Sequence, residues 1–80
     1  MLSNTQKDKL VVGLKQSAKA MSSGLAKSIY IANNTDPVIV SDLEKTATEN
    51  NVGVIYVDTM KELGAMCGIN VGASCAVIIR

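Results

Sequence analysis

The segment from Gly13 to Lys19 holds the residues best suited to chemistry in this chain. A glycine ends an apolar run, and a helical pattern opens directly after it with Lys15, Gln16 and Lys19 on one face. The start of a helix offers backbone N–H groups that bind anions, and lysine and amide side chains add further donors beside them. This combination suits a phosphate backbone with base edges next to it. The alternative reading of the same pattern is a tight turn followed by an ordinary solvated helix face.

Catalytic and metal-dependent chemistry find little support in the sequence. The chain has no histidine, so it lacks a general base near neutral pH and any pairing of a nucleophile with histidine. Cys67 and Cys75 are two thiols without further soft ligands, too few for a zinc site, and we expect them to be reduced core residues. Asp42 and Glu44 stand two apart on a predicted helix and therefore point to different faces. We expect no enzyme activity, no catalytic residue, no metal and no cofactor.

Length and composition predict a single domain over residues 1–80 with an aliphatic core. The chain is 48% hydrophobic but only 2% aromatic, without Trp or Phe, which leaves almost no platform for stacking bases on a sheet. Gly64, Gly68 and Gly72 recur at intervals of four, but no phosphate-loop lysine and serine follow them. The first twenty residues carry charges and no long apolar run. We therefore expect neither a signal peptide nor a membrane span, and a cytoplasmic protein.

The net charge of +1 conceals an uneven distribution along the chain. Residues 1–27 hold five lysines against one aspartate, a balance of +4, and residues 28–80 hold three basic against six acidic residues, a balance of −3. A local basic patch attracts a polyanion that the total charge would not predict. A solvated lysine face is again the alternative.

Apolar patterns and capping residues predict alternating strands and helices. Asp36 and Pro37 are typical of a helix N-cap and first turn, and Thr59 and Glu62 form a capping-box pattern. The expected strands are 10–12, 28–32, 52–57 and 75–79; the expected helices begin near residues 15, 37 and 60 and end before residue 24, near residue 50 and at residue 67. This order predicts an α/β fold, a three-layer α-β-α sandwich with one mixed four-stranded sheet. Crossover connections would place the turn at 13–19 and the loop at 69–74 at strand ends, where such folds collect their sites.

Four motifs together resemble one known family. They are Gly-Leu-Lys-Gln-Ser-Ala-Lys at 13–19, Ala-Asn-Asn-Thr-Asp-Pro at 32–37, Lys-Glu-Leu-Gly-Ala-Met-Cys-Gly at 61–68 and Val-Gly-Ala-Ser at 71–74. In this order and spacing the chain is similar to the kink-turn-binding ribosomal protein family of the L-seven-Ae type, and most of all to its small bacterial members. The resemblance covers the chain from about Leu10 to Ile79.

The resemblance implies a role for two segments of the chain. The glycine-led helix start would enter the widened major groove of an RNA kink-turn and read its tandem sheared G·A pairs. The mostly apolar loop at 69–74 would pack against a base flipped out at the kink, where small residues let the backbone approach closely. The RNA-binding residues implied in this way are Gly13, Leu14, Lys15, Gln16, Lys19, Val71, Gly72, Ala73 and Ser74.

Three departures from the family pattern bear on how RNA would be read. Archaeal and eukaryotic relatives carry Asn-Glu where this chain has Lys15 and Gln16; Lys15 only donates, and so can address guanine O6 and N7 or a phosphate. Ala65 stands where a lysine is common, which is expected to weaken phosphate contacts. Asn33 and Asn34 stand where relatives are often acidic, which is expected to offset part of that loss.

The sequence thus predicts a monomeric protein that recognises and stabilises kink-turn motifs in structured RNA such as ribosomal or riboswitch RNA. The ribosome is a further expected partner, and a membrane is not. Two alternatives stay open. The first is a ribosome-associated docking module that uses the acidic helix at 36–50 and reads no RNA, and the second is a small-ligand or redox protein that uses Cys67 and Cys75.

Overall fold

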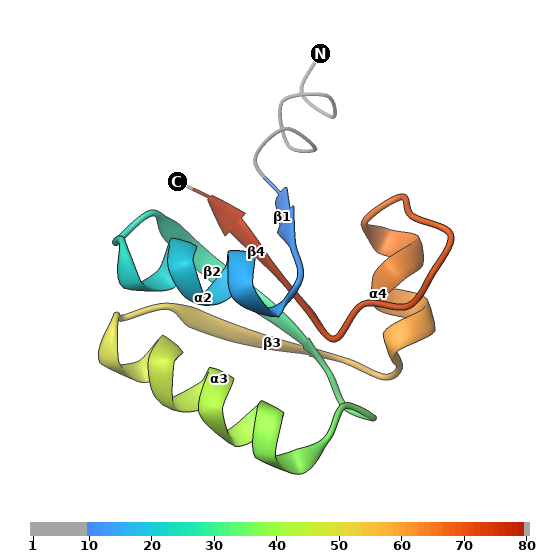
Figure 1. The fold of residues 1–80 in the computed structure, drawn as a ribbon, viewed down its shortest axis with the longest axis horizontal. Helices are drawn as coiled ribbons and strands as arrows, with labels where there is room; N and C mark the ends of the chain where they lie inside the picture. The colour runs from blue at the N-terminus through green and yellow to red at the C-terminus, as the bar shows by residue number, and fades with distance from the viewer. Residues whose placement is uncertain (1–9, 80) are drawn as a thin grey trace.

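The computed structural model describes residues 10–79, which form a four-stranded mixed sheet (Figure 1). β4 runs antiparallel to both of its neighbours, β1 and β2, while β2 and β3 are parallel. Parallel neighbours need a crossover connection, and the chain makes it through α3. In spatial order the strands are β1 (Leu10–Val12), β4 (Cys75–Ile79), β2 (Ala26–Ala32) and β3 (Gly53–Val57).

Helices cover both faces of this sheet. α2 (Leu14–Ser22) and α3 (Pro37–Glu49) pack on one face, and Figure 1 shows α2 in front of the strands and α3 alongside β3. α4 (Met60–Met66) packs through Leu63 on the other face. Successive residues of β2 serve the two layers in turn, since Ile31 lies in the core under α2 and α3 and Ala32 in the core under α4. The predicted three-layer α/β sandwich with one mixed sheet is confirmed.

Capping residues begin two of the helices as predicted. The Asp36 side chain accepts a hydrogen bond from the backbone N–H of Val38 at 2.9 Å, and Pro37 occupies the first helical position of α3. Thr59 accepts from the backbone N–H of Glu62 at 3.1 Å and so begins α4. Both hydrogen bonds join residues at most three positions apart, so each helix start is marked by local sequence.

β2 begins two residues earlier than the sequence pattern predicts. The predicted strand starts at Ser28, whereas the structure begins β2 at Ala26, which pairs with Ile79 of β4 across a register shift. Alanine, lysine and serine carry little intrinsic strand preference, so local sequence gives no signal there. Pairing with β4 extends the strand to these first residues.

Three strand ends meet at one edge of the sheet. Val12 at the end of β1 pairs with Ala76, Ala32 at the end of β2 donates its N–H to the carbonyl of Ser74 at 2.9 Å, and Asn33 donates to the carbonyl of Val57 at 2.7 Å. The turn that leads into α2 and the loop that leads into β4 therefore lie at the same edge.

Two further properties of residues 10–79 concern membranes and metals. None of the helices there combines the length and the apolar character needed to cross a bilayer. In the same stretch, no three His, Cys, Asp or Glu side chains gather into a group that could hold a metal ion.

Candidate functional site

The turn into α2 is built on the backbone of Gly13. This residue has φ 110° and ψ 156°, a conformation open almost only to glycine, and its carbonyl accepts the first helical hydrogen bond, from Ser17 N–H, at 2.9 Å. Glycine offers no side chain to cap the helix, and within residues 10–79 no side chain makes a cap hydrogen bond to the first N–H groups of α2. The start of α2 therefore carries the partial positive charge that attracts anions.

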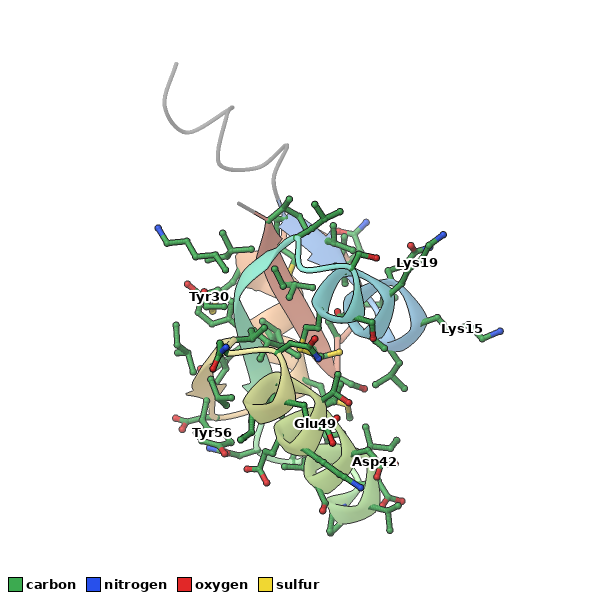
Figure 2. All side chains as sticks on the ribbon, turned by 90° about the vertical axis from the view of Figure 1, so that its left-hand side faces the viewer. Lys15, Lys19, Tyr30, Asp42, Glu49 and Tyr56 are labelled. Atoms are coloured by element: carbon green, nitrogen blue, oxygen red, sulfur yellow. The ribbon has the colours of Figure 1, made fainter. Side chains whose placement is uncertain are left out.

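The polar side chains predicted to read a ligand are exposed on α2. Lys15, Gln16 and Lys19 all lie on the solvent side of the helix, and Figure 2 shows the two lysines projecting outward from α2, away from the sheet. Leu14, at the first helical position, is 39% exposed. Of the other lysines in the basic part of the sequence, Lys27 lies on β2, and those at positions 7 and 9 lie outside the described residues. The structure thus presents two cations and an amide beside an uncapped helix start.

The second predicted segment, residues 69–74, is the connection from α4 to β4 and is called here the α4–β4 loop. Its first four residues, 69–72, are all exposed and form its outer surface, with Val71 at 69% and Ile69 at 38%. Ala73 is only 6% exposed and packs in the core under α4, and Ser74 is half-buried. The side chain of Ala73 therefore anchors the loop to the core, and of the four predicted residues at 71–74 it is Val71 and Gly72 that are open to a ligand.

A backbone hydrogen bond joins the two predicted segments. The N–H of Gly13 donates to the carbonyl of Cys75 at 3.2 Å, and Cys75 directly follows the α4–β4 loop. At the end of that loop, Ser74 offers its carbonyl to Ala32 N–H at 2.9 Å and to the Thr35 hydroxyl at 3.5 Å. The start of α2 and the α4–β4 loop are thereby fixed next to each other at one edge of the sheet.

The thiols have the environment of core residues. Cys75 is fully buried and Cys67 partly buried, and both are unpaired. Burial raises the pKa of the Cys75 thiol, and the nearby Ser17 hydroxyl opposes part of that rise. Burial also raises the pKa of Cys67, and the negative charge of a Cys75 thiolate would raise it further. A reactive thiol needs a lowered pKa, so these environments speak against the redox alternative.

The predicted acidic helix is α3, beside α2. Asp42 and Glu49 are exposed on it, as Figure 2 shows, while the Glu44 carboxylate accepts a hydrogen bond from the Tyr56 hydroxyl. That hydrogen bond raises the pKa of Tyr56. A groove separates α2 from α3; its walls are formed by Leu14, Ala18, Ile39, Asp42, Leu43 and Thr46. Basic and acidic side chains thus lie on adjacent helices on one side of the sheet.

Several residues that shape the site escape a reading of the sequence. The Asn34 side chain accepts a hydrogen bond from Met60 N–H at 2.8 Å, a contact between residues far apart in the chain. A Cβ added to Gly64 would lie 2.0 Å from the carbonyl oxygen of Val71, so α4 touches the α4–β4 loop directly. Ser17 lies on α2 among the predicted reading residues but is fully buried. None of these contacts leaves a signal in local spacing.

The fold and this edge define an α/β sandwich whose candidate site combines a helix start with a neighbouring loop. The model of the Ribosomal protein L7Ae/L30e/S12e/Gadd45 family matches residues 2–80, and the chain belongs to this family. Its membership confirms the resemblance found in the four sequence motifs.

Curated relatives match over nearly the whole chain. An RNA-binding protein of Geobacillus sp. (strain WCH70) is 44% identical over 75 residues, which cover 94% of this chain and 92% of the relative. An RNA-binding protein of Caldanaerobacter subterraneus subsp. tengcongensis is 43% identical over 68 residues, 85% of this chain and 83% of the relative. The RNA-binding protein YbxF of Geobacillus stearothermophilus is 40% identical over 75 residues, with coverage of 94% and 92%.

A solved structure shares the fold. The Giardia lamblia 15.5kD RNA binding protein superposes with a TM-score of 0.84 at 24% sequence identity, over 91% of this chain. The chain spans 62% of the length of that protein. At this level of identity the likeness establishes the architecture of the sandwich and supports no residue-by-residue comparison.

Proposed function

We propose that this protein binds structured RNA and recognises the kink-turn through the start of α2 and the α4–β4 loop. The observation that carries the proposal is the hydrogen bond from Gly13 N–H to the Cys75 carbonyl, which holds these two segments at one edge of the sheet. Membership of the family and the names of the curated relatives, each an RNA-binding protein, support an RNA ligand.

The start of α2 supplies hydrogen-bond donors for the base edges and phosphates of an RNA groove. Lys15 and Gln16 are exposed in the first turn, where Lys15 can donate to guanine O6 and N7 and Gln16 can both donate and accept. These capacities match the purine edges of tandem G·A pairs. Lys19 lies one helical turn beyond Lys15 and suits a backbone phosphate, and the first N–H groups of α2 can bind a phosphate at the helix start.

The α4–β4 loop supplies an apolar surface for an unstacked base. Val71 is exposed and Gly72 adds no side chain, so a base can approach both the valine methyl groups and the backbone. RNA is commonly recognised through bases that leave the helical stack, and apolar contact with their faces adds affinity without reading sequence. A bent RNA would place such a base beside the groove that α2 enters.

A protein of this shape would stabilise the kinked form by population shift. A kink-turn interconverts between extended and bent forms, and a surface that contacts only the bent form shifts the equilibrium by its differential affinity. Ribosomal and riboswitch RNAs are the proposed targets and the cytoplasm is the proposed compartment. The protein would act as a monomer and without enzymatic chemistry.

Binding to matched RNAs tests this proposal. Affinity is measured across a salt series for a kink-turn RNA and for the same duplex with its G·A pairs replaced by Watson–Crick pairs. We expect strong preference for the kink-turn. Lys15→Ala or Gln16→Ala should each reduce binding by about 1–3 kcal/mol and weaken the preference, while Lys19→Ala should lower the slope against salt by about one.

Lys27 provides the matched control. It is exposed and carries the same charge, but it follows Ala26 at the opposite end of β2, where that strand pairs with Ile79. Lys27→Ala should leave the preference between the two RNAs unchanged. Equal affinity of the wild-type protein for both RNAs would refute kink-turn recognition and favour the docking module, with α3 as its acidic surface.

A further inference from the structure

The α4–β4 loop rests on the first residue of α4. Ala73 N–H donates to the Met60 carbonyl at 3.0 Å, and the Ser74 hydroxyl donates to the Met60 sulfur at 3.7 Å. A Cβ built on Gly72 would lie 3.2 Å from the Met60 Cβ, so the loop backbone also packs tightly against this residue. The position of Met60 therefore sets the position of the backbone at residues 72 and 73.

α4 touches the outer part of the loop as well. Gly64 faces the backbone of Val71 so closely that an added Cβ would lie 2.0 Å from the Val71 carbonyl oxygen. The loop end, by contrast, is held by β2, because the Ser74 carbonyl accepts from Ala32 N–H at 2.9 Å. The exposed residue Val71 thus takes its place from α4, and Ser74 takes its place from the sheet.

Asn34 links these two supports. It follows β2, and its side-chain oxygen accepts a hydrogen bond from Met60 N–H at 2.8 Å. Met60 opens α4, and its N–H is one of those that a helix cannot satisfy internally. Thr59 caps the neighbouring Glu62 N–H at 3.1 Å, so Asn34 is the one contact, among residues 10–79, that ties the first N–H of α4 to the end of β2.

We infer that Asn34 is a positioning residue for RNA recognition, which acts through Met60 to hold Val71 in the position that contact with an unstacked base requires. This inference rests on the proposed function and assigns to Asn34 a role that requires no contact with RNA. Asn34 is exposed, so water can replace its oxygen at Met60 N–H and the fold is expected to survive its loss. What is lost is the fixed distance between α4 and β2, and with it the preorganisation of the loop.

A double-mutant cycle on RNA affinity tests the inference. Asn34→Ala should weaken binding to kink-turn RNA by roughly three- to tenfold, the range that one hydrogen bond supplies. If Asn34 acts through the loop, its effect should largely vanish in a Val71→Ala background, because there the loop no longer offers the side chain that needs positioning. In a Lys19→Ala background the two losses should multiply, since Lys19 lies on α2.

Two further variants separate positioning from charge and from general destabilisation. Asn34→Asp keeps an acceptor for Met60 N–H and should keep the hydrogen-exchange protection of the Ala73 amide, which Asn34→Ala should lower. The Asp variant is expected to bind RNA more weakly only through its added charge, and therefore less so as salt is raised. Asn33→Ala is the matched control, because the Asn33 side chain is exposed and makes no hydrogen bond with any residue from 10 to 79.

The outcomes distinguish this inference from the proposed function. If the wild-type protein fails to prefer the kinked RNA, the proposed function is refuted and the role of Asn34 with it. If the preference is intact but Asn34→Ala binds RNA like wild type, the inference alone is overturned. The same holds if Asn34→Ala reduces RNA affinity by the same factor in the wild-type and the Val71→Ala backgrounds. Coupling to Val71, independence from Lys19 and a less protected Ala73 amide would together support it.

Discussion

Gly13 offers a direct test of how far the proposed RNA-binding edge depends on a backbone conformation that only glycine adopts without strain. Its φ of 110° and ψ of 156° fall in a region that is essentially restricted to glycine, while a Cβ added there would meet no atom within 4 Å. A Gly13→Ala substitution therefore introduces strain without a steric clash. Placing a residue with a side chain in this region costs about 1–3 kcal/mol, which for a domain of this size lowers the melting temperature by roughly 5–20 °C.

Urea unfolding followed by far-ultraviolet circular dichroism measures this loss, and Gly24 supplies the control. Gly24 also has a positive φ, 75°, and also has open space around its missing Cβ, but it lies in the left-handed region that asparagine tolerates. We expect Gly24→Asn to lose less stability than Gly24→Ala loses. Gly13→Asn should lose as much as Gly13→Ala, because asparagine gains no advantage at the Gly13 conformation.

RNA binding adds a second readout to the same series. If the alanine variant relieves its strain by changing the turn, the hydrogen bond from Gly13 N–H to the Cys75 carbonyl is lost and the two segments separate. Affinity for kink-turn RNA should then fall in Gly13→Ala but not in Gly24→Ala. The reasoning is refuted if Gly13→Ala unfolds at the wild-type urea concentration and binds RNA like wild type, or if asparagine rescues it.

Three further predictions concern the packing beneath this edge. Gly64→Ala should reduce the free energy of unfolding by about 3 kcal/mol or more because its Cβ would collide with the Val71 carbonyl, whereas Gly53→Ala, with a nearest neighbour at 3.7 Å, should be nearly neutral; thermal melts compare the two. The raised pKa of Cys75 means that its contribution to stability is present below its usual pKa of 9.0 and is lost as the pH rises through the folded-state value, so urea midpoints should fall above pH 9 and fall less in Cys75→Ala. The Ser17 hydroxyl is buried and lies near the Cys75 thiol, whose pKa it lowers, but it makes no hydrogen bond of normal geometry among residues 10–79; Ser17→Ala should therefore leave the free energy of unfolding in urea unchanged or raise it by up to about 1 kcal/mol, and a clear loss would contradict this view of the hydroxyl.

The elements that the sequence predicts well are those whose starts and ends are local. The Asp36 side chain satisfies a backbone N–H two residues ahead, and Thr59 satisfies one three residues ahead, so the first turns of α3 and α4 are encoded within a few positions. Gly24 and Gly68 adopt positive φ just beyond α2 and α4, as glycine-capped helix ends do. Alternating aliphatic residues then decide the two faces of the sheet, and the layered architecture follows.

The parts that escape prediction depend on contacts between distant residues. The first residues of β2 become a strand because β4 lies beside them, and their own types carry no strand signal. In the sequence Asn34 stands where relatives are often acidic, yet in the structure its side-chain oxygen accepts a hydrogen bond from the first N–H of α4. Gly64 reads as a small residue in a short helix, yet it permits contact with the loop backbone. Such roles require the sheet to be assembled first.

The start of β4 unites the two halves of the candidate site. The Cys75 carbonyl receives the N–H of Gly13, and the preceding Ser74 carbonyl receives the N–H of Ala32, so one short stretch of backbone fixes the turn into α2 and the end of the α4–β4 loop. Binding that requires both segments benefits when neither has to be ordered by the ligand, because the loss of loop freedom has already occurred on folding. Changes at this stretch should therefore weaken the contributions of Lys15 and Val71 together, whereas changes at Asn34 should weaken that of Val71 alone. The coupling pattern between these positions, more than the size of any single loss, separates a prearranged two-part RNA surface from an exposed helix that happens to carry lysines.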